Sequence, residues 1–426
     1  MRLSAILVAA LTVTASWAQT TREVMLADPL KCAGLYIPYP DSIAGPSPVP
    51  LGYVPFYVGH YGRHGSRYLG EDHDYRRVYD VLEKASRAGT LTPRGTELFE
   101  SMTRIWHDAG GRGGQLAPLG YRQHRGIASR LLAECGPAFD DSARVTAVST
   151  VFMRCAHSMF AFVDRIRQYN PALEIPMESG DRNMNVLSHL NAGAVAFNNT
   201  NPVGDKLDDF RRQMIDPERF MASIFKDAGM PSIGVPARDF MWWVYLVAID
   251  LPNLDTDESL FGYFTPQELF DLWQMFNYNY YTFHSGNPDN GGVFIESAKP
   301  LLGDFVRQAD DYIARGDHGA TLRFGHDSSV IPLAALLQFP VASGRESDPA
   351  RLYKVYADYR VSPMASNIQM RLYRKPTGGG DGEIIVKFML NEQEMPLPDT
   401  PAYIYPYYRW SDARATLQRL LDTPIQ

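Results

Sequence analysis

The sequence contains little cysteine: three of its 426 residues, Cys32, Cys135 and Cys155. Three scattered cysteines exclude a small disulfide-built scaffold and do not form a cysteine metal site by themselves. In an oxidising compartment two of them could pair and leave one over. Cys135 and Cys155 would join two adjacent elements, but pairing also needs a geometry that spacing does not supply, so it stays open at this point.

An excess of basic residues is also absent. The chain has 41 Lys and Arg against 48 Asp and Glu, a net charge of −7. This balance excludes a general nucleic-acid binder, which would present a basic face. Any anionic ligand must therefore be held by a local pocket. With 45% hydrophobic residues the chain can bury a large core, and its length allows two domains or one elaborated domain.

No segment other than the N-terminus resembles a transmembrane helix. Arg2 precedes the apolar stretch "LSAILVAALTVTA", and "SWA" forms a small-x-small cleavage site that ends at Ala18. The stretch is shorter than the roughly 20 apolar residues that span a bilayer. We therefore expect residues 1–18 to be a signal peptide, cleaved after Ala18, and the mature protein to be periplasmic or secreted without a membrane anchor.

The order of predicted elements indicates an α/β fold. Residues 53–61 predict a buried strand, which helices over 74–89, 92–110 and 119–137 follow, then a strand over 143–150 and a helix over 154–170. The strand signal fades from about 170 to 318, where helices are expected over 216–230, 265–286 and 296–317. Strands return over 320–326, 367–375 and 383–390, with 376–382 as the loop between the last two. We expect a sheet covered by helices, interrupted by a mostly α-helical insertion.

One glycine-rich stretch, "VGHYGRHGSRYLG" at residues 58–70, concentrates positive charge directly after the first strand. Glycines there let backbone N–H groups approach an anion, and Arg63 and Arg67 can offer forked donors to phosphate oxygens. His64 between them could act as a nucleophile. The alternatives are a solvated polar loop or a zinc site on His60 and His64. The glycines oppose the helix that such zinc spacing needs, and no Glu follows His60.

Two later segments could complete such a site. Arg154 lies just past a predicted strand in "VSTVFMRCAHS", and His326 and Asp327 end another in "LRFGHDSSVIPLAALL". Ligands in open α/β sheets bind beyond the carboxyl ends of strands. The alternatives are a surface charge for Arg154 and a plain helix cap for Asp327.

Taken together, these motifs resemble the histidine acid phosphatases, branch 2 of the histidine phosphatase superfamily. The resemblance rests on "RHGSR", on a Ser-Thr pair with Arg154 four residues on, and on the distant Gly-His-Asp; "LTPRG" and "LAPLGYRQHRGIASRL" also match helix openings of that family. It runs from about residue 53 to the C-terminus. It implies a phosphoglycerate mutase-like sheet domain over 19–168 and 319–426, split by an α-helical insertion domain over 169–318.

The resemblance also implies roles for individual residues. His64 would be the nucleophile that becomes phosphorylated, and Asp327 would protonate the leaving alcohol and then help to activate water. The phosphate would be bound by Arg63, Arg67, Arg154 and His326. Three arginines and a histidine can neutralise a phosphoryl group without a metal, so no cofactor is expected.

Within the family, "RFGHDSSVIPLAALLQF" and "LNEQEMPLP" look most like the multiple inositol polyphosphate phosphatases, which suggests phytate-like substrates. Two positions depart from the pattern of that group. His326 is followed by Asp327, whereas the group commonly has His-Ala-Glu as its proton-donor motif. Leu69 replaces the proline that often closes the first motif. His73, Arg76 and Arg77 could bind further phosphates or simply be solvated. The alternatives are a broad-specificity acid or sugar-phosphate phosphatase, a phosphotransferase, or a binding module without activity. The expected partner is a small phosphorylated molecule; the oligomeric state is left open.

Overall fold

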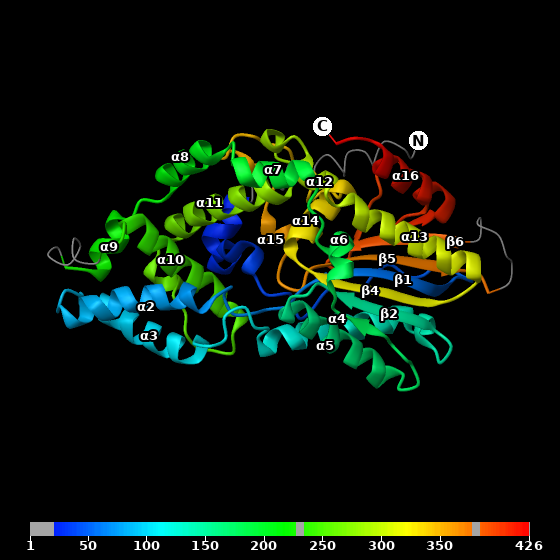
Figure 1. Cartoon of the computed structure of the whole chain (residues 1–426), viewed down its shortest axis with the longest axis horizontal. Coiled ribbons are helices and arrows are strands. Elements are labelled where there is room, and N and C mark those ends of the chain that lie inside the picture. The colour runs from blue at the N-terminus through cyan, green and yellow to red at the C-terminus, as the bar shows by residue number, and fades with distance from the viewer. Residues whose placement is uncertain (1–20, 227–233, 377–383, 426) are drawn as a thin grey trace, which may run out of the picture.

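The computed structural model describes residues 21–226, 234–376 and 384–425, and a single mixed sheet runs through these residues (Figure 1). The order of its nine strands is β3-β2-β4-β1-β5-β6-β9-β8, with β7 beside β6. Their bounds are β1 Val54–Arg63, β2 Arg144–Ser149, β3 Met177–Glu178, β4 Gly319–Gly325, β5 Asn367–Arg374, β6 Ile384–Leu390, β7 Gln393–Met395, β8 Ala402–Ile404 and β9 Tyr407–Arg409.

The three strands at the heart of the sheet, β2, β4 and β1, are parallel, whereas β5, β6, β8 and β9 are antiparallel to their neighbours. Arg63 pairs with Gly325 and Ser149 with Phe324, so the three parallel strands end at the same edge. Nearly every residue of β1 and β4 is buried, as expected for strands covered on both faces. This register brings the residues that follow each strand to one place.

Helices cover both faces of the sheet (Figure 1). Helices α4 (Pro118–Cys135) and α5 (Met153–Tyr169) pack on one face, and α13 (Lys299–Arg315), α14 (Asp327–Leu336) and α16 (Trp410–Asp422) on the other. Shorter helices are α6 Met184–Leu187, α7 Ala192–Thr200, α8 Gly204–Met214, α12 Val293–Glu296 and α15 Asp358–Val361.

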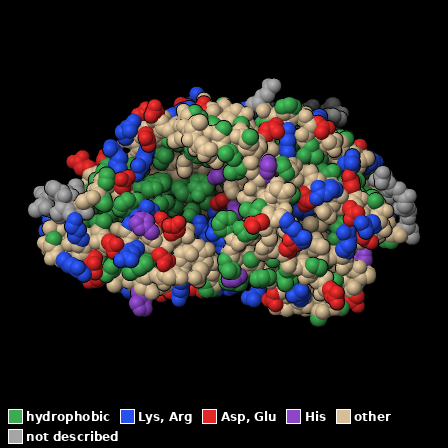
Figure 2. All heavy atoms as spheres, viewed as in Figure 1, with side chains coloured by type: hydrophobic (Ala, Val, Ile, Leu, Met, Phe, Trp, Pro, Cys, Tyr) green, Lys and Arg blue, Asp and Glu red, His purple; other side chains and the backbone are tan. Residues whose placement is uncertain are grey.

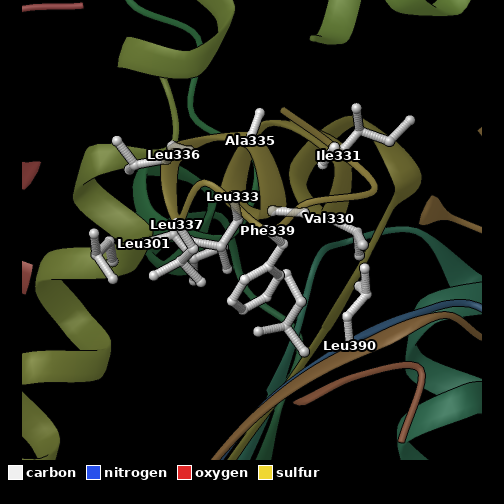
Figure 3. Close-up of a cluster of buried hydrophobic side chains, with 14 of the residues drawn as sticks. Leu301, Val330, Ile331, Leu333, Ala335, Leu336, Leu337, Phe339 and Leu390 are labelled. Carbon is white, nitrogen blue, oxygen red and sulfur yellow. The ribbon is translucent and has the colours of Figure 1, made fainter. Parts of the chain in front are cut away.

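Helix α14 is apolar on all sides, which is the pattern of a helix enclosed in a core. Its side chains pack against α13, β6 and the segment after the helix (Figure 3). The labelled residues of this cluster are Leu301, Val330, Ile331, Leu333, Ala335, Leu336, Leu337, Phe339 and Leu390. Because the helix is enclosed, its first residues, which follow β4, are held firmly at the edge of the sheet.

A second hydrophobic core lies beyond that edge. It joins the 3-10 helix η1 (Pro29–Tyr36) with α2 (Asp72–Arg87), α3 (Pro93–Ala109), α9 (Glu218–Ile224), α10 (Ala237–Asp250) and α11 (Pro266–His284). Helices α2 and α3, which the predicted boundaries place in the sheet domain, therefore share a core with the middle third of the chain. The domain boundaries themselves stay a prediction.

Most elements expected from the sequence are confirmed, including the five long strands and the capping box of Thr265 and Glu268 that begins α11. Helix α9 is shorter than the predicted 216–230, because Phe225 is extended and forms a bridge with Leu91. Helix α10 was not among the expected elements. The signal peptide and residues 377–382 of the expected loop lie outside the described residues.

The three cysteines are buried free thiols, so Cys135 and Cys155 do not pair. Among the described residues, no helix is both long enough and apolar enough to cross a membrane.

The segment after β1 crosses the start of α4 at very short range. Gly65 and Gly120 are both buried, and a Cβ on Gly65 would lie 2.6 Å from Gly120 Cα and 2.7 Å from its carbonyl oxygen. Real Cβ atoms do not approach backbone this closely. Only glycine lets the chain after β1 lie directly on α4.

We expect Gly65→Ala to lower the free energy of unfolding by about 1–3 kcal/mol, because α4 and the segment must separate. Urea unfolding would measure the change. Gly70→Ala is the matched control in the same segment, since its Cβ would meet only Asp74 Oδ2, at 3.8 Å. A Gly65→Ala protein as stable as the Gly70→Ala protein would contradict the close approach.

Candidate active site

The ends of β1, β2 and β4 bring together all six residues that the family resemblance singles out. Arg63 ends β1, with His64 and Arg67 directly after it. Arg154 lies in the first turn of α5, after β2. His326 and Asp327 follow β4, where α14 begins, and the His64 and His326 rings lie edge to face with centroids 5.6 Å apart. We call these six residues the cationic cluster.

His64 is held in one tautomer. Its backbone N–H donates to Gly325 O at 2.9 Å, and its Nδ1 lies 3.0 Å from Gly65 O. Because a carbonyl can only accept, Nδ1 carries the hydrogen, and Nε2 keeps a lone pair. Burial, with Arg63 and Arg67 beside it, holds the pKa of His64 well below its usual value. The imidazole is therefore neutral and suited to nucleophilic attack.

The segment that carries His64 is fixed by side chains from several elements. Ser158 Oγ accepts from Gly65 N at 3.1 Å, and Gln123 Oε1 accepts from Ser66 N at 2.8 Å. Ser66 Oγ donates to Asn253 Oδ1 at 2.7 Å. These partners come from α5, α4 and the turn after α10. The segment that carries His64 is thus tied both to the helices on one face of the sheet and to the second hydrophobic core.

Arg63 is completely buried. Its Nη1 donates to Leu35 O at 2.6 Å and to Ser362 O at 2.7 Å, and its Nη2 pairs with Asp327 Oδ2 at 2.9 Å. This guanidinium therefore fixes the position of Asp327 relative to His64.

Arg67 and Arg154 supply the other two positive charges. Arg67 donates through Nη1 to Tyr68 O at 2.7 Å and through Nη2 to Tyr36 Oη at 3.0 Å. Arg154 lies over the Phe152 ring, 4.9 Å from its centroid, and has no hydrogen-bond or ion-pair partner among the described residues. A half-buried guanidinium without a partner can bind an anion in the cluster.

His326 and Asp327 complete the cluster. Tyr61 Oη accepts from His326 N at 3.2 Å, and Thr150 Oγ1 lies 3.3 Å from His326 Nε2. Burial and the charge of Arg154 lower the pKa of His326 to about 4. Burial by itself would raise the pKa of Asp327, but Arg63, His284 and His326 outweigh it and lower that pKa to about 2.

The structure does not show the plain N-cap that was the alternative for Asp327, because His326 is the N-cap residue of α14 and the helix begins with Asp327. Its Oδ1 accepts from Ser328 N at 2.8 Å at the start of α14, while its Oδ2 faces Arg63. With both histidines neutral, three guanidinium charges and one carboxylate leave the cluster a net charge of +2. A phosphate dianion would neutralise this charge.

The three further candidates do not join the cluster. His73 is exposed at the start of α2, and Arg76 Nε lies 3.5 Å from Asp80 Oδ2. Arg77 Nη2 lies 3.0 Å from Asp74 Oδ1, and its guanidinium covers Trp243 at 4.8 Å. Arg76 is exposed, as the solvated alternative expects, whereas Arg77 is mostly buried against Trp243.

Sequence reasoning missed several residues beside the cluster. Thr150 belonged to a motif that was noted only for Arg154. Tyr36 lies in η1, and Tyr280 and His284 lie one turn apart near the end of α11. Local sequence gives no signal for these residues, because only the packing of η1 and α11 brings them to the strand ends.

The alternative of a zinc site is not supported by the packing of His60. Its ring lies against Phe162 and Phe324, with centroids 4.8 and 5.2 Å away. No group of three or more potential metal ligands occurs in residues 21–226, 234–376 and 384–425.

Comparisons with known proteins place this geometry in a known fold. No family model and no curated protein matches the sequence. The multiple inositol polyphosphate phosphatase of Bifidobacterium longum, crystallised with inositol hexasulfate, is similar with a TM-score of 0.75 at 18% identity, over 91% of this chain and 97% of that one. The phytase of D. castellii is similar with a TM-score of 0.72 at 14% identity, over 92% of this chain and 85% of that one. The chain therefore has the fold that the family resemblance implied.

Proposed function

We propose that this chain is a phosphomonoester hydrolase that works through a phosphohistidine on His64. The observation that carries the proposal is the convergence of Arg63, Arg67 and Arg154 around a neutral imidazole whose Nε2 is free. Phosphoryl transfer needs positioning and neutralisation of charge more than covalent chemistry from the protein, and the cationic cluster offers both.

In the first step His64 Nε2 attacks phosphorus and forms the P–N bond while the P–O bond to the leaving alcohol breaks. The three guanidinium groups and His326 hold the equatorial oxygens of the phosphoryl group. Asp327 donates its proton to the departing oxygen, because an alkoxide is a poor leaving group.

The proton on Asp327 must arrive with the substrate. With its pKa near 2, this carboxyl is ionised in the free protein at every working pH. A phosphomonoester monoanion carries one proton and can pass it to Asp327 on binding. The bound phosphate also offsets the positive charges that otherwise keep Asp327 ionised.

In the second step water attacks the phosphohistidine and the P–N bond breaks. The Asp327 carboxylate accepts the proton of that water, and His64 returns to its neutral form. Asp327 then passes that proton to the departing phosphate, which leaves as the monoanion. Asp327 is ionised again, and atoms and protons balance over the cycle.

The substrate class that we propose to test first is the inositol polyphosphates. The motifs "RFGHDSSVIPLAALLQF" and "LNEQEMPLP" support it, as do a similar structure that holds inositol hexasulfate and another named as a phytase. We also propose that the protein is exported, on the evidence of the apolar N-terminal stretch and the cleavage site that ends at Ala18.

His64→Ala should abolish turnover, because the variant lacks the nucleophile. Alkaline quench of the wild-type enzyme during turnover of a radiolabelled phosphomonoester should trap phosphate on His64. His107→Ala removes an exposed histidine of α3 and should keep both the rate and the label. Activity of His64→Ala within tenfold of the wild type, or a label on serine or aspartate, would refute the mechanism.

Asp327→Asn should slow release of phosphate from inositol hexakisphosphate on the order of 10²–10⁴-fold. The loss should be smaller for p-nitrophenyl phosphate, whose leaving group needs little protonation. Asparagine can still accept from Ser328 N, so a role limited to capping predicts nearly unchanged rates.

Steady-state rates on both esters would measure this contrast. If both losses are equal, burst kinetics would show whether hydrolysis of the phosphohistidine limits both. A near-wild-type rate of Asp327→Asn on inositol hexakisphosphate would leave Asp327 with a structural role only. Failure of the wild type on this substrate would contradict the substrate class.

We expect kcat/KM to be highest at acidic pH. Above the second pKa of the ester, about 6, the proton-carrying monoanion disappears, and kcat/KM should fall by about tenfold per pH unit. Below pH 6 the rate should hold, because burial and neighbouring arginines keep His64 neutral well below the usual histidine pKa. A pH series on one alkyl phosphate measures this, and an optimum near pH 8 would disprove the proposed proton source.

A further inference from the structure

Phe152 is a large apolar residue at a position that neither helix formation nor core packing explains. It is the N-cap residue of α5, a place where a small polar side chain usually accepts a hydrogen bond from the first turn, and its own side chain makes no such bond. Phe152 is 44% exposed and belongs to none of the hydrophobic cores that the described residues form. Its ring therefore contributes to something other than the stability of the fold.

The Phe152 ring contacts two members of the cationic cluster. The guanidinium carbon of Arg154 lies over the ring, 4.9 Å from its centroid. The His326 ring lies nearly perpendicular to it, with centroids 4.8 Å apart. His326 is itself placed by Tyr61 and Thr150, so it is a fixed neighbour for Phe152. The Phe152 ring thus joins a firmly held residue after β4 to an arginine of α5.

Arg154 is the arginine of the cluster that needs such a contact. Arg63 and Arg67 are fixed by hydrogen bonds to backbone carbonyls. No hydrogen bond or ion pair holds the Arg154 guanidinium within the described part of the chain. A long side chain without a partner samples several rotamers, and fixing it when a ligand binds costs entropy and weakens binding. Contact with the ring restricts this motion before the ligand arrives.

An aromatic ring can fix a guanidinium without using its hydrogen-bond donors. A carboxylate beside Arg154 would occupy its N–H groups and offset its charge, as Asp327 does for Arg63. The face of a phenyl ring attracts the cation through its quadrupole and leaves the N–H groups available for phosphate oxygens. Arg154 therefore keeps both its charge and its donors while the ring holds it.

The position of each arginine matters because the surrounding surface is not strongly basic. Basic and acidic side chains are intermixed over the face of the molecule that Figure 2 shows, and the net charge of the chain is −7. At long range these charges largely offset one another. A phosphate is therefore held by its short-range contacts in the cationic cluster.

We propose that Phe152 is a positioning residue of the phosphate site: its ring, fixed against His326, holds the Arg154 guanidinium in the cationic cluster and leaves its donors free. The inference rests on the proposed phosphatase activity and adds to it the residue that orders the third arginine. It applies to any phosphomonoester, inositol polyphosphates included, because Phe152 acts on the group that binds the phosphate and not on the leaving group.

Binding of inorganic phosphate, measured by isothermal titration calorimetry, tests this role without turnover. Phe152→Leu and Phe152→Met keep an apolar side chain but lack the ring, and both should bind phosphate on the order of three- to tenfold more weakly than the wild type. Phe152→Tyr keeps the ring and should bind as the wild type does. Met153→Leu changes the exposed neighbour, so it is the matched control and should also bind normally. Because Phe152 is exposed, urea unfolding should show all four variants to be about as stable as the wild type.

A double-mutant cycle shows whether the ring acts through Arg154. In Phe152→Leu, kcat/KM for p-nitrophenyl phosphate should fall by a factor similar to that for phosphate binding, mainly through a higher KM. In an Arg154→Ala background the same change should have little further effect, because the group that the ring holds is gone. Equal losses in the two backgrounds would overturn the proposal.

The outcomes separate the two proposals. If the wild type hydrolyses p-nitrophenyl phosphate and the ring-free variants bind phosphate as tightly as it does, the role of Phe152 is wrong and the phosphatase stands. A loss in Phe152→Tyr as large as that in Phe152→Leu would overturn the role equally, because the ring is still present. If the wild type hydrolyses no phosphomonoester, the proposed function fails, and the role of Phe152 fails with it.

Discussion

The buried guanidinium of Arg63 is the interaction on which the site depends. A charge with no access to water is costly unless it is paired and hydrogen-bonded, and Arg63 meets this need through Leu35 O, Ser362 O and Asp327. These partners come from η1, from the segment before β5 and from the start of α14. One side chain therefore joins the helical core to the sheet and sets the distance between His64 and Asp327. Loss of Arg63 would free Asp327 and leave two carbonyls without these donors, so stability and the geometry of the site are coupled at this residue.

Asp358 fixes the position of Leu35, whose carbonyl oxygen accepts a hydrogen bond from Arg63. Its carboxyl accepts from Leu35 N at 3.1 Å and from Trp273 Nε1 at 2.9 Å, and Gly34 packs so closely that a Cβ would lie 2.6 Å from Asp358 Oδ2. Burial raises the pKa of Asp358 to about 6, although these hydrogen bonds act in the opposite direction. A carboxyl whose pKa is raised by folding stabilises the fold fully below its unfolded pKa of about 4, and this contribution is lost as the pH rises through 6. The protonated Asp358 carboxyl thus favours the folded state most in acid, while its attraction to Arg63 belongs to the ionised form.

Sequence patterns predicted the strand ends but not the far side of the site. The buried strand before "GRHGSR" and the strand before Gly-His-Asp are apolar runs that end in glycine, so the meeting of His64, His326 and Asp327 follows from parallel pairing. Helix α10 was missed because "FMWWVYLVAI" is apolar throughout and shows no period that separates helix from strand. Tyr280 could not be located because its place depends on how α11 packs on η1. Such contacts join segments more than 200 residues apart, and no local pattern encodes them.

The charge of the cationic cluster limits what can bind next to it. Its net charge of +2 is equal in size and opposite in sign to the charge of one phosphate dianion, so a single bound phosphate would neutralise it. Arg63 and Arg67 are held by hydrogen bonds and Arg154 lies over Phe152, so the three guanidinium groups are in place before a phosphate binds. A phosphoryl group would therefore meet charges that need no reorganisation, which is the arrangement that stabilises developing negative charge most strongly.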